Sequence, residues 1–286
     1  MIDKEEILIA AKKESLDPSI IEKDYVIGWL LRGIYHMEQI RDIWIFKGGT
    51  AIKKCYFNEY RFSEDLDFSL LNTDQENLPN LQEILLESVE WVHDLSGIEI
   101  SPAAIEIDVY KTPLGWDAIQ AKLTYNGPLR RKTNFPRIKL DLTFHEKIVL
   151  EPEKRNIFHP YSDLPKENIQ ARCYPFEELF AEKIRALAER TRPRDIYDVI
   201  HFYQSRRKLK SKKLLLQILE EKCKFKRIPL PSLQAIQSRL DIENLNSEWQ
   251  RMLAHQLPKL NLFEESWALM PTIFDWLYDK NIQENP

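Results

Sequence analysis

The hydrophobic pattern of the chain changes character near residue 176. Before that point, short runs of alternating apolar and polar residues predict β-strands, because successive side chains of a strand point to opposite faces. After it, apolar residues recur every three or four positions, which is the spacing of an amphipathic helix. The pattern predicts an α+β fold, with a mixed-sheet lobe over residues 1–160 and a helical lobe over 161–286.

The first lobe is predicted to open with helices and to continue as a sheet. Asp17 can cap a helix that begins at Pro18, and a later helix is expected over 78–95. The loop over 151–165, which contains three prolines, is the expected lobe boundary. Strands are expected over 42–46, 65–71, 98–110, 116–125 and 137–144.

The first candidate functional site lies where the strand over 42–46 is followed by a pair of glycines. Gly48 and Gly49 have no Cβ, so the backbone there can approach a phosphate closely. The helix that follows opens at Thr50, whose hydroxyl and first N–H groups are donors for an anion. A Gly-Gly turn alone is a weak signal. Followed by a strand with two aspartates, it favours a site for a phosphorylated substrate.

Those two aspartates are Asp65 and Asp67, which project from the same face of their strand because they are two residues apart. Adjacent like charges are unfavourable unless a cation compensates them, and paired carboxylates hold Mg²⁺ beside substrate phosphates. The alternative is a pair of solvent-facing aspartates on an edge strand. Asp141 is either a third metal ligand or an ordinary residue on the polar face of its strand.

Lys183 and Asp198 are candidates in the helical lobe. Lys183 lies at the centre of an apolar helical stripe, so its ammonium either reaches out to solvent or meets an anion such as a triphosphate, and the second is expected. Asp198 lies one turn deeper in its helix than Asp195, where the helix dipole no longer explains a carboxylate. It either reaches the reaction cleft or forms a structural salt bridge.

Charge and cysteine content give weaker information about function than the candidate site residues do. The net charge of −4 gives no global case for nucleic-acid binding, but Ser205–Arg227 carries ten basic and two acidic residues. This stretch is either a contact surface for phosphate backbone or a solvated helix face. Three dispersed cysteines suggest neither a disulfide framework nor a zinc site. The charged N-terminus and the lack of a long apolar segment favour the cytoplasm and no membrane span.

Four segments together resemble the AbiEii/AbiGii-type nucleotidyltransferase toxins, which are relatives of the MenT toxins. They occur in family order between Glu22 and Phe202. In chain order they are EKDY, FKGGTAIKKCYFNEYRFSEDLDFSL, AEKIRALAER and PRDIYDVIHF. The resemblance implies a DNA polymerase β-like nucleotidyltransferase lobe joined to a helical lobe. It also implies the toxin of a type IV toxin–antitoxin or abortive-infection pair, with an antitoxin encoded nearby that need not bind the toxin directly.

The resemblance also implies roles for individual residues. The triphosphate would bind at Gly48, Gly49 and Thr50, and Ser63 would lie beside the nucleotide. Mg²⁺ would be held by Asp65 and Asp67, with Asp141 as a third ligand, while Lys183 and Asp198 would complete the catalytic cleft. The spacing between Gly-Thr and Asp-x-Asp is longer than in many polymerase β-like enzymes, although it suits this toxin branch.

The expected reaction is transfer of a nucleoside monophosphate from an NTP to an acceptor hydroxyl, with release of pyrophosphate. The 3′ end of a tRNA is the expected acceptor. Three alternatives stay open: nucleotidylation of a protein side chain by the same site, a non-catalytic nucleotide- or RNA-binding module, and hydrolysis of a phosphate ester by the same metals.

Overall fold

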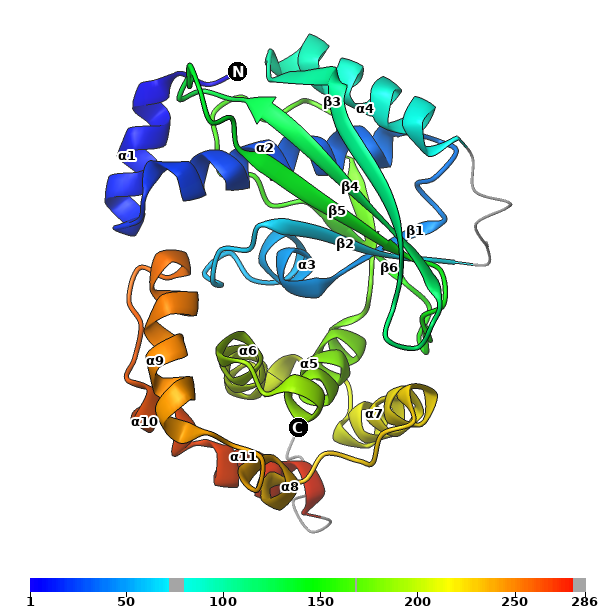
Figure 1. Cartoon of the computed structure of the whole chain (residues 1–286), viewed down its shortest axis with the longest axis vertical. Helices are drawn as coiled ribbons and strands as arrows, with labels where there is room; N and C mark the ends of the chain where they lie inside the picture. The colour runs from blue at the N-terminus through cyan, green and yellow to red at the C-terminus, as the bar shows by residue number, and fades with distance from the viewer. Residues whose placement is uncertain (72–79, 168, 280–286) are drawn as a thin grey trace. The chain divides into compact units, whose positions relative to one another are not determined.

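A computed structural model describes residues 1–71, 80–167 and 169–279. The chain divides into two compact units, one spanning Met1–Tyr174 and one beginning at Pro175. The first unit contains a β-sheet with flanking helices, whereas the described residues of the second form helices and turns (Figure 1). The α+β class is therefore confirmed.

The sheet of the first unit has seven strands in the order β3-β4-β5-β2-β1-β7-β6. Two neighbouring pairs are parallel, β2 with β5 and β1 with β7, and the other neighbours are antiparallel. The short strands β1 and β2 consequently lie in the interior of the sheet. The strands are β1 (Trp44–Lys47), β2 (Asp65–Leu70), β3 (Glu99–Lys111), β4 (Asp117–Asn126), β5 (Arg137–Thr143), β6 (Glu153–Asn156) and β7 (Gln170–Cys173).

One face of this sheet packs against helices and forms the hydrophobic core. Helices α2 (Pro18–His36) and α4 (Leu81–Ser96) lie together against it, and α1 (Lys4–Glu14) packs on α2 (Figure 1). Alternation explains the choice of face, because Ile138, Leu140 and Leu142 of β5 are fully buried in this core. The residues between them point to the opposite, polar face.

Helix α2 begins where the sequence predicts. The side chain of Asp17 accepts a hydrogen bond of 2.8 Å from the backbone N–H of Ser19, and Pro18 is the first helical residue. Helix α4 is capped in the same manner by Asn80, and residues 78 and 79 of the helix expected there lie outside the described residues.

Strands β6 and β7 were not predicted from the sequence. β6 lies within the expected loop over 151–165, and its four residues, Glu-Lys-Arg-Asn, contain no apolar side chain. β7 is equally short, yet it pairs in parallel with β1, and the backbone N–H of Tyr174 donates to the carbonyl oxygen of Phe46 at 3.0 Å. The sheet therefore continues past residue 160, and the first unit ends at Tyr174.

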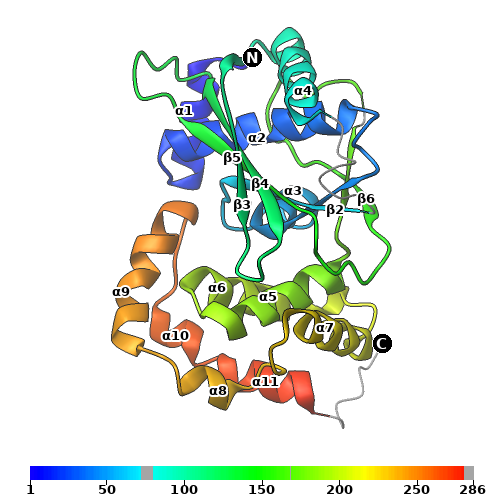
Figure 2. The ribbon, with the colours of Figure 1, turned by 45° about the vertical axis from the view of Figure 1, so that its right-hand side comes forward.

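The second unit is built around helix α5, which packs against α6 and α7 (Figure 2). Aromatic stacking joins α5 to α6, since the ring centroids of Phe180 and Phe202 lie 5.0 Å apart at an interplanar angle of 12°. Across the described ranges of both units, no helix combines the length and apolarity needed to cross a membrane. The helices of the second unit are α5 (Phe176–Arg190), α6 (Pro193–Gln204), α7 (Lys212–Lys226), α8 (Leu233–Gln237), α9 (Ile242–Leu253), α10 (Phe263–Trp267) and α11 (Met270–Tyr278).

Candidate active site

Strand β1 runs directly into helix α3 (Gly48–Cys55) without an intervening loop. Gly48 makes the turn with φ of +79°, a backbone conformation that favours glycine. A Cβ on Gly48 would lie 2.2 Å from Oδ2 of Asp67. Glycine is therefore required twice here, for the backbone angle and for the close approach of the carboxylate.

The next glycine brings two polar side chains against the first turn of α3. A Cβ on Gly49 would lie 2.8 Å from Oγ of Ser63 and 3.1 Å from Nη2 of Arg61. The structure thus places the predicted Gly49 and Ser63 together and adds Arg61, which sequence reasoning missed. A hydroxyl and a guanidinium beside the N–H groups of a helix N-terminus are all suited to bind an anion.

Thr50 contacts the strand that carries Asp65. Its side chain is buried, and its hydroxyl donates to the backbone carbonyl oxygen of Asp65. In this structure the hydroxyl therefore holds α3 against β2. The donors that α3 can offer to a phosphate are its backbone N–H groups, which receive no side-chain cap.

The candidate carboxylates share the polar face of two neighbouring strands. In the parallel pair of β2 and β5, Asp67 lies opposite Asp141 and Asp65 lies opposite Lys139. Paired strands are about 4.8 Å apart, so Asp67 and Asp141 stand side by side. Oδ1 of Asp141 accepts a hydrogen bond of 2.9 Å from Nε2 of Gln120 on β4. Asp65, Asp67 and Asp141 are thus brought to one face, next to the start of α3.

The ionisation of Asp65 reflects its burial first and its charged neighbours second. Burial raises the pKa of Asp65; the nearby Lys139 opposes the rise, and the carboxylates of Asp141 and Glu64 add to it. Burial also raises the pKa of Tyr110 on β3, with further contributions from Asp141 and Asp67. A cation bound at this face would lower the cost of ionising these carboxylates.

The side chains here suit Mg²⁺ in their chemistry, since carboxylate oxygens are its preferred protein ligands. Within residues 1–71, 80–167 and 169–279, no three Asp, Glu, His or Cys side chains converge closely enough to form a metal-binding group. The three carboxylates therefore share a face and a register without their oxygens meeting at one point. Binding of a metal would require side-chain rotation, which the half-buried positions of Asp65, Asp67 and Asp141 allow.

Lys183 and Asp198 belong to the second unit, where they form an ion pair. Nζ of Lys183 lies 2.7 Å from Oδ2 of Asp198, whose side chain is fully buried. The apolar stripe around Lys183 is also present, because Phe176, Leu179 and Phe180 are buried on the same helix. The anion that Lys183 meets in the structure is therefore a carboxylate of its own unit. The role of this pair in nucleotide chemistry stays a prediction.

The family model described as nucleotidyl transferase AbiEii toxin, type IV TA system, matches residues 29–280. The chain belongs to the AbiEii nucleotidyltransferase toxin family. It is similar in fold to MenT4, a nucleotidyltransferase toxin from Mycobacterium tuberculosis, with 20% identity, a TM-score of 0.65, and coverage of 99% of this chain and 91% of MenT4. It is also similar to JHP933 from Helicobacter pylori, with 17% identity, a TM-score of 0.54, and coverage of 93% and 94%. No curated protein matched the chain.

In this AbiEii-family chain the EKDY segment has a structural role that the sequence did not reveal. Nζ of Lys54 on α3 lies 2.7 Å from Oδ2 of Asp24 on α2, and both side chains are buried. The hydroxyl of Tyr161 donates to the same carboxylate at 3.0 Å. Beside this pair, Lys23 binds Glu64 at 2.7 Å. The segment therefore ties α2 to α3 and to the residue that precedes Asp65.

Other polar residues of the face were also missed from the sequence. Nζ of Lys47, the last residue of β1, donates to Oγ1 of Thr143 on β5 at 2.9 Å. Lys47 also lies opposite Asp67 in the antiparallel pair of β1 and β2. Alternation along each strand could have placed Lys47 and Gln120 on the polar face, but their partners come from long-range strand pairing.

Asp195 has a structural role in the helical unit. Arg190 donates to both of its carboxylate oxygens, each at 2.8 Å, and Asp195 also accepts from the backbone N–H of Arg192 at the start of α6. Such a bidentate pair with a helix cap satisfies the carboxylate completely. Asp195 therefore fixes the turn between α5 and α6.

The basic stretch over Ser205–Arg227 does not form one surface. Lys222 is buried, with Nζ 2.7 Å from Glu178 and 2.8 Å from Glu182. Lys212 donates to the backbone carbonyl oxygens of Trp276 and Asp279. Arg206, Arg207 and Lys208 are exposed on a short 3-10 turn after α6. Only part of the stretch is thus available to a phosphate backbone.

Proposed function

We propose that this chain transfers a nucleoside monophosphate from an NTP to an acceptor hydroxyl of RNA, the 3′ end of a tRNA, and releases pyrophosphate. The observation that carries the proposal is the meeting of two features in the first unit. An uncapped helix start at Gly48 and Gly49 lies beside the face that displays Asp65, Asp67 and Asp141. Phosphate donors and metal-binding carboxylates side by side suit phosphoryl transfer better than they suit plain anion binding.

In this proposal Asp65 and Asp67 hold Mg²⁺, with Asp141 as the third carboxylate. When bound, Mg²⁺ neutralises phosphate oxygens and helps to align the reacting groups. The backbone N–H groups at the start of α3 and the hydroxyl of Ser63 bind the triphosphate. The guanidinium of Arg61 lies next to Gly49, as Ser63 does, and adds positive charge to this anion site.

The reaction is an in-line displacement at the α-phosphorus. A bond forms between the acceptor oxygen and the α-phosphorus, the bond to the bridging oxygen breaks, pyrophosphate leaves, and the hydroxyl proton is released. Lys183 and Asp198 lie in the segments AEKIRALAER and PRDIYDVIHF, which resemble later motifs of the family. From this resemblance we propose that Lys183 neutralises the charge of the leaving pyrophosphate and that Asp198 acts in the same active site. Their ion pair of 2.7 Å supports Asp198 as the residue that positions Lys183.

The choice of an RNA acceptor is supported by surface charge, and tRNA is our proposal within that class. MenT4, which is similar in fold, is a nucleotidyltransferase toxin, and this supports nucleotidyl transfer without specifying the acceptor. The exposed Arg206, Arg207 and Lys208 offer positive charge to an RNA backbone, and such binding weakens steeply with added salt. We expect the protein to act in the cytoplasm, where NTPs and tRNA occur, and an antitoxin encoded nearby to counter it without the need for direct binding.

The test offers each labelled NTP, with Mg²⁺, to a tRNA pool and to total cell protein. Label in tRNA with release of pyrophosphate supports the proposal, and chelation of the metal should abolish it. Label in protein alone would show protein nucleotidylation by the same site. Release of phosphate without a labelled acceptor would show hydrolysis, and unchanged turnover in Asp65→Asn would exclude these carboxylates from catalysis.

A further inference from the structure

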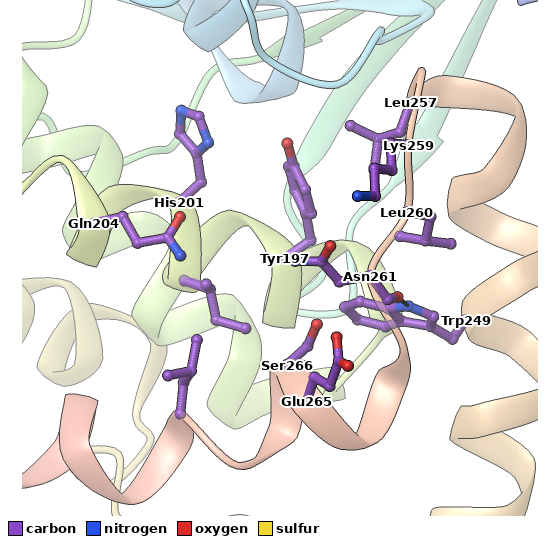
Figure 3. Close-up of a pocket in the computed structure, with 12 residues that line it drawn as sticks. Tyr197, His201, Gln204, Trp249, Leu257, Lys259, Leu260, Asn261, Glu265 and Ser266 are labelled. Atoms are coloured by element: carbon purple, nitrogen blue, oxygen red, sulfur yellow. Dashed lines mark hydrogen bonds between the residues drawn. The ribbon is translucent and has the colours of Figure 1, made fainter. Parts of the chain in front are cut away.

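The second unit contains a pocket that the proposed phosphoryl transfer leaves without a role. Helix α6 forms one wall, and Trp249 of α9 lies on the other side with residues 257–261, next to Glu265 and Ser266 of α10 (Figure 3). Its volume is about 230 Å³. All lining residues follow Pro175, so the pocket is complete within one unit.

Aromatic rings line this pocket. Tyr197 and His201 are one helical turn apart on α6, and their rings stack with centroids 6.0 Å apart and planes inclined by 23°. Both side chains are half-buried. The indole of Trp249 is buried, and its Nε1 donates to the carbonyl oxygen of Asn261 at 2.9 Å, which fixes residues 257–261 against α9. Rings fixed in this way offer a surface on which a planar group can stack.

Hydrogen-bonding groups surround the rings. Gln204 and Asn261 carry amides that can both donate and accept, and Glu265 can accept (Figure 3). Such a mixture matches the alternating donors and acceptors on the edge of a nucleobase. The single positive charge of Lys259 is balanced by the single negative charge of Glu265, so the rim has no excess positive charge to bind a triphosphate.

The size of the pocket selects the ligand further. Pockets for drug-sized molecules have volumes of about 300–1,000 Å³, and this one is smaller. It accommodates one ring system with part of a sugar.

We propose that the pocket binds one unstacked base of the single-stranded RNA acceptor. The inference rests on the proposed function, because that function supplies RNA as the acceptor. Stacking on aromatic side chains with edge hydrogen bonds is how proteins bind unstacked bases of single-stranded RNA.

The test measures binding of a fluorescein-labelled single-stranded hexaribonucleotide to the full chain by fluorescence anisotropy. Tyr197→Leu should raise the Kd about tenfold, which is the order expected for loss of one base stack. Tyr278→Leu is the matched control, because Tyr278 lies in the same unit but packs on Phe274 and does not line the pocket. Thermal unfolding followed by circular dichroism verifies that both variants fold. Equal Kd values for Tyr197→Leu and the unmodified protein would overturn the inference.

A second variant keeps the test decisive if Tyr197→Leu does not fold. Gln204 is exposed at the rim, so Gln204→Ala should leave the fold intact and change the preference among oligo(A), oligo(C), oligo(G) and oligo(U). Gln217→Ala on α7 is the matched control, since Gln217 is equally exposed and lies outside the pocket. The same base preference in all three proteins would overturn the inference.

Two further arms separate this inference from the proposed function. Asp65→Asn should lose transfer but bind the hexaribonucleotide with unchanged Kd, so loss of binding and loss of catalysis are read independently. The base of the donor NTP has the same chemistry as an RNA base. If Tyr197→Leu weakened binding of free NTP and left RNA binding unchanged, the pocket would belong to the donor. Photocrosslinking of RNA containing 4-thiouridine should label peptides spanning 197–204 or 257–266, and absence of these crosslinks would also overturn the inference.

Discussion

Asp24 and Asp65 are both shielded from solvent in the first unit, yet the pKa of Asp24 is lowered and that of Asp65 is raised. Burial disfavours ionisation of Asp24, but the ammonium groups of Lys54 and Lys53 more than compensate and hold its pKa below the usual range. Burial raises the pKa of Asp65, and the charge of Lys139 does not reverse the rise. The two sites therefore differ in how completely neighbouring lysines compensate the negative charge of the carboxylate.

This difference separates a carboxylate with a structural role from one that we propose to be functional. Asp24 is bonded by Lys54 and Tyr161, which leaves little capacity for a ligand. Asp65 stands on a face where the register adds Asp67 and Asp141, so negative charge accumulates. A fold gains no stability from such accumulation. The proposed function offers an explanation, because a cation and a phosphorylated substrate would complete the site.

The largest expected effect is on catalysis. Asp65→Asn should lower the rate of transfer by about 10³-fold, the order seen when one preorganised electrostatic group is removed from an active site. The same change should leave the protein as stable or more stable at neutral pH, because a carboxyl with a raised pKa is costly to ionise in the folded state. Initial rates with labelled NTP and urea unfolding measure the two quantities.

The matched control for this change is Asp108→Asn. Asp108 lies on the polar face of β3 opposite Gln120, but it is exposed and paired with Lys122 at 2.9 Å. It should keep full activity. An equal loss of activity in both variants would mean that general charge on this face, and not a defined metal site, governs the reaction.

The second effect concerns stability. Asp24→Ala should lower the free energy of unfolding by about 3–5 kcal/mol, because it leaves the buried ammonium of Lys54 without its carboxylate. Urea unfolding monitored by circular dichroism measures the change. Asp94→Ala, at an exposed position of α4, is the control and should cost little. An unaltered unfolding midpoint in Asp24→Ala would remove the distinction between the two aspartates.

Acidification should destabilise the scaffold through His159. Burial lowers the pKa of His159 to about 4, whereas an unfolded histidine titrates near 6.5. Between these values the unfolded chain binds more protons, so the free energy of unfolding should fall as the pH is lowered, by at most about 1.4 kcal/mol per pH unit. Asp65 acts with the opposite sign, since its raised pKa favours the folded state at low pH.

Urea unfolding at intervals from pH 4 to pH 7 measures this slope. His159→Asn should show a shallower slope than the unmodified protein over the same range. The ring nitrogen resonances of His159 provide a direct second reading, and a pKa near 6.5 would contradict the expected direction.

The smallest expected effect tests the turn at Gly48. Gly48→Ala combines an unfavourable backbone angle with a clash against Asp67, and should lower the free energy of unfolding by about 1–3 kcal/mol. Gly115 is a close control, since its φ is also +79° but a Cβ there would meet nothing within 4 Å. The difference between Gly48→Ala and Gly115→Ala in urea unfolding isolates the contact with Asp67. Equal costs would show that only the backbone angle matters.

Local pattern was sufficient for much of the first unit. Alternation placed Asp65 and Asp67 on one face and buried Ile138, Leu140 and Leu142 on the other side of β5, as the structure confirms. Local pattern could not predict how distant strands pair. Asp141 lies next to Asp67 because of the parallel register of β2 and β5. The contact between the Thr50 hydroxyl and the backbone carbonyl oxygen of Asp65 illustrates the same limit, while the predicted contact of Thr50 with a triphosphate stays a prediction.

The missed features are those without a local signature. Strand β6 has no apolar residue, and β7 is four residues long, so neither shows a readable alternation. The EKDY segment looks like an ordinary polar turn of a helix in the sequence, and only the fold reveals that Asp24 receives Lys54. The resemblance to the toxin family marked this segment without explaining it.

The parallel pairing of β1 with β7 also has a consequence for synthesis of the protein. β1 is complete at Lys47, but the strand that covers its other edge ends at Cys173. At about 5–20 residues per second, a ribosome needs roughly 6–25 s to pass between them. Once β5 has been made, the nascent chain contains the carboxylates of β2 and β5, but the strand that leads into α3 still has one edge open. A ribosome that stops between β5 and β7 would therefore release a chain with all the proposed metal ligands and an incomplete sheet around them.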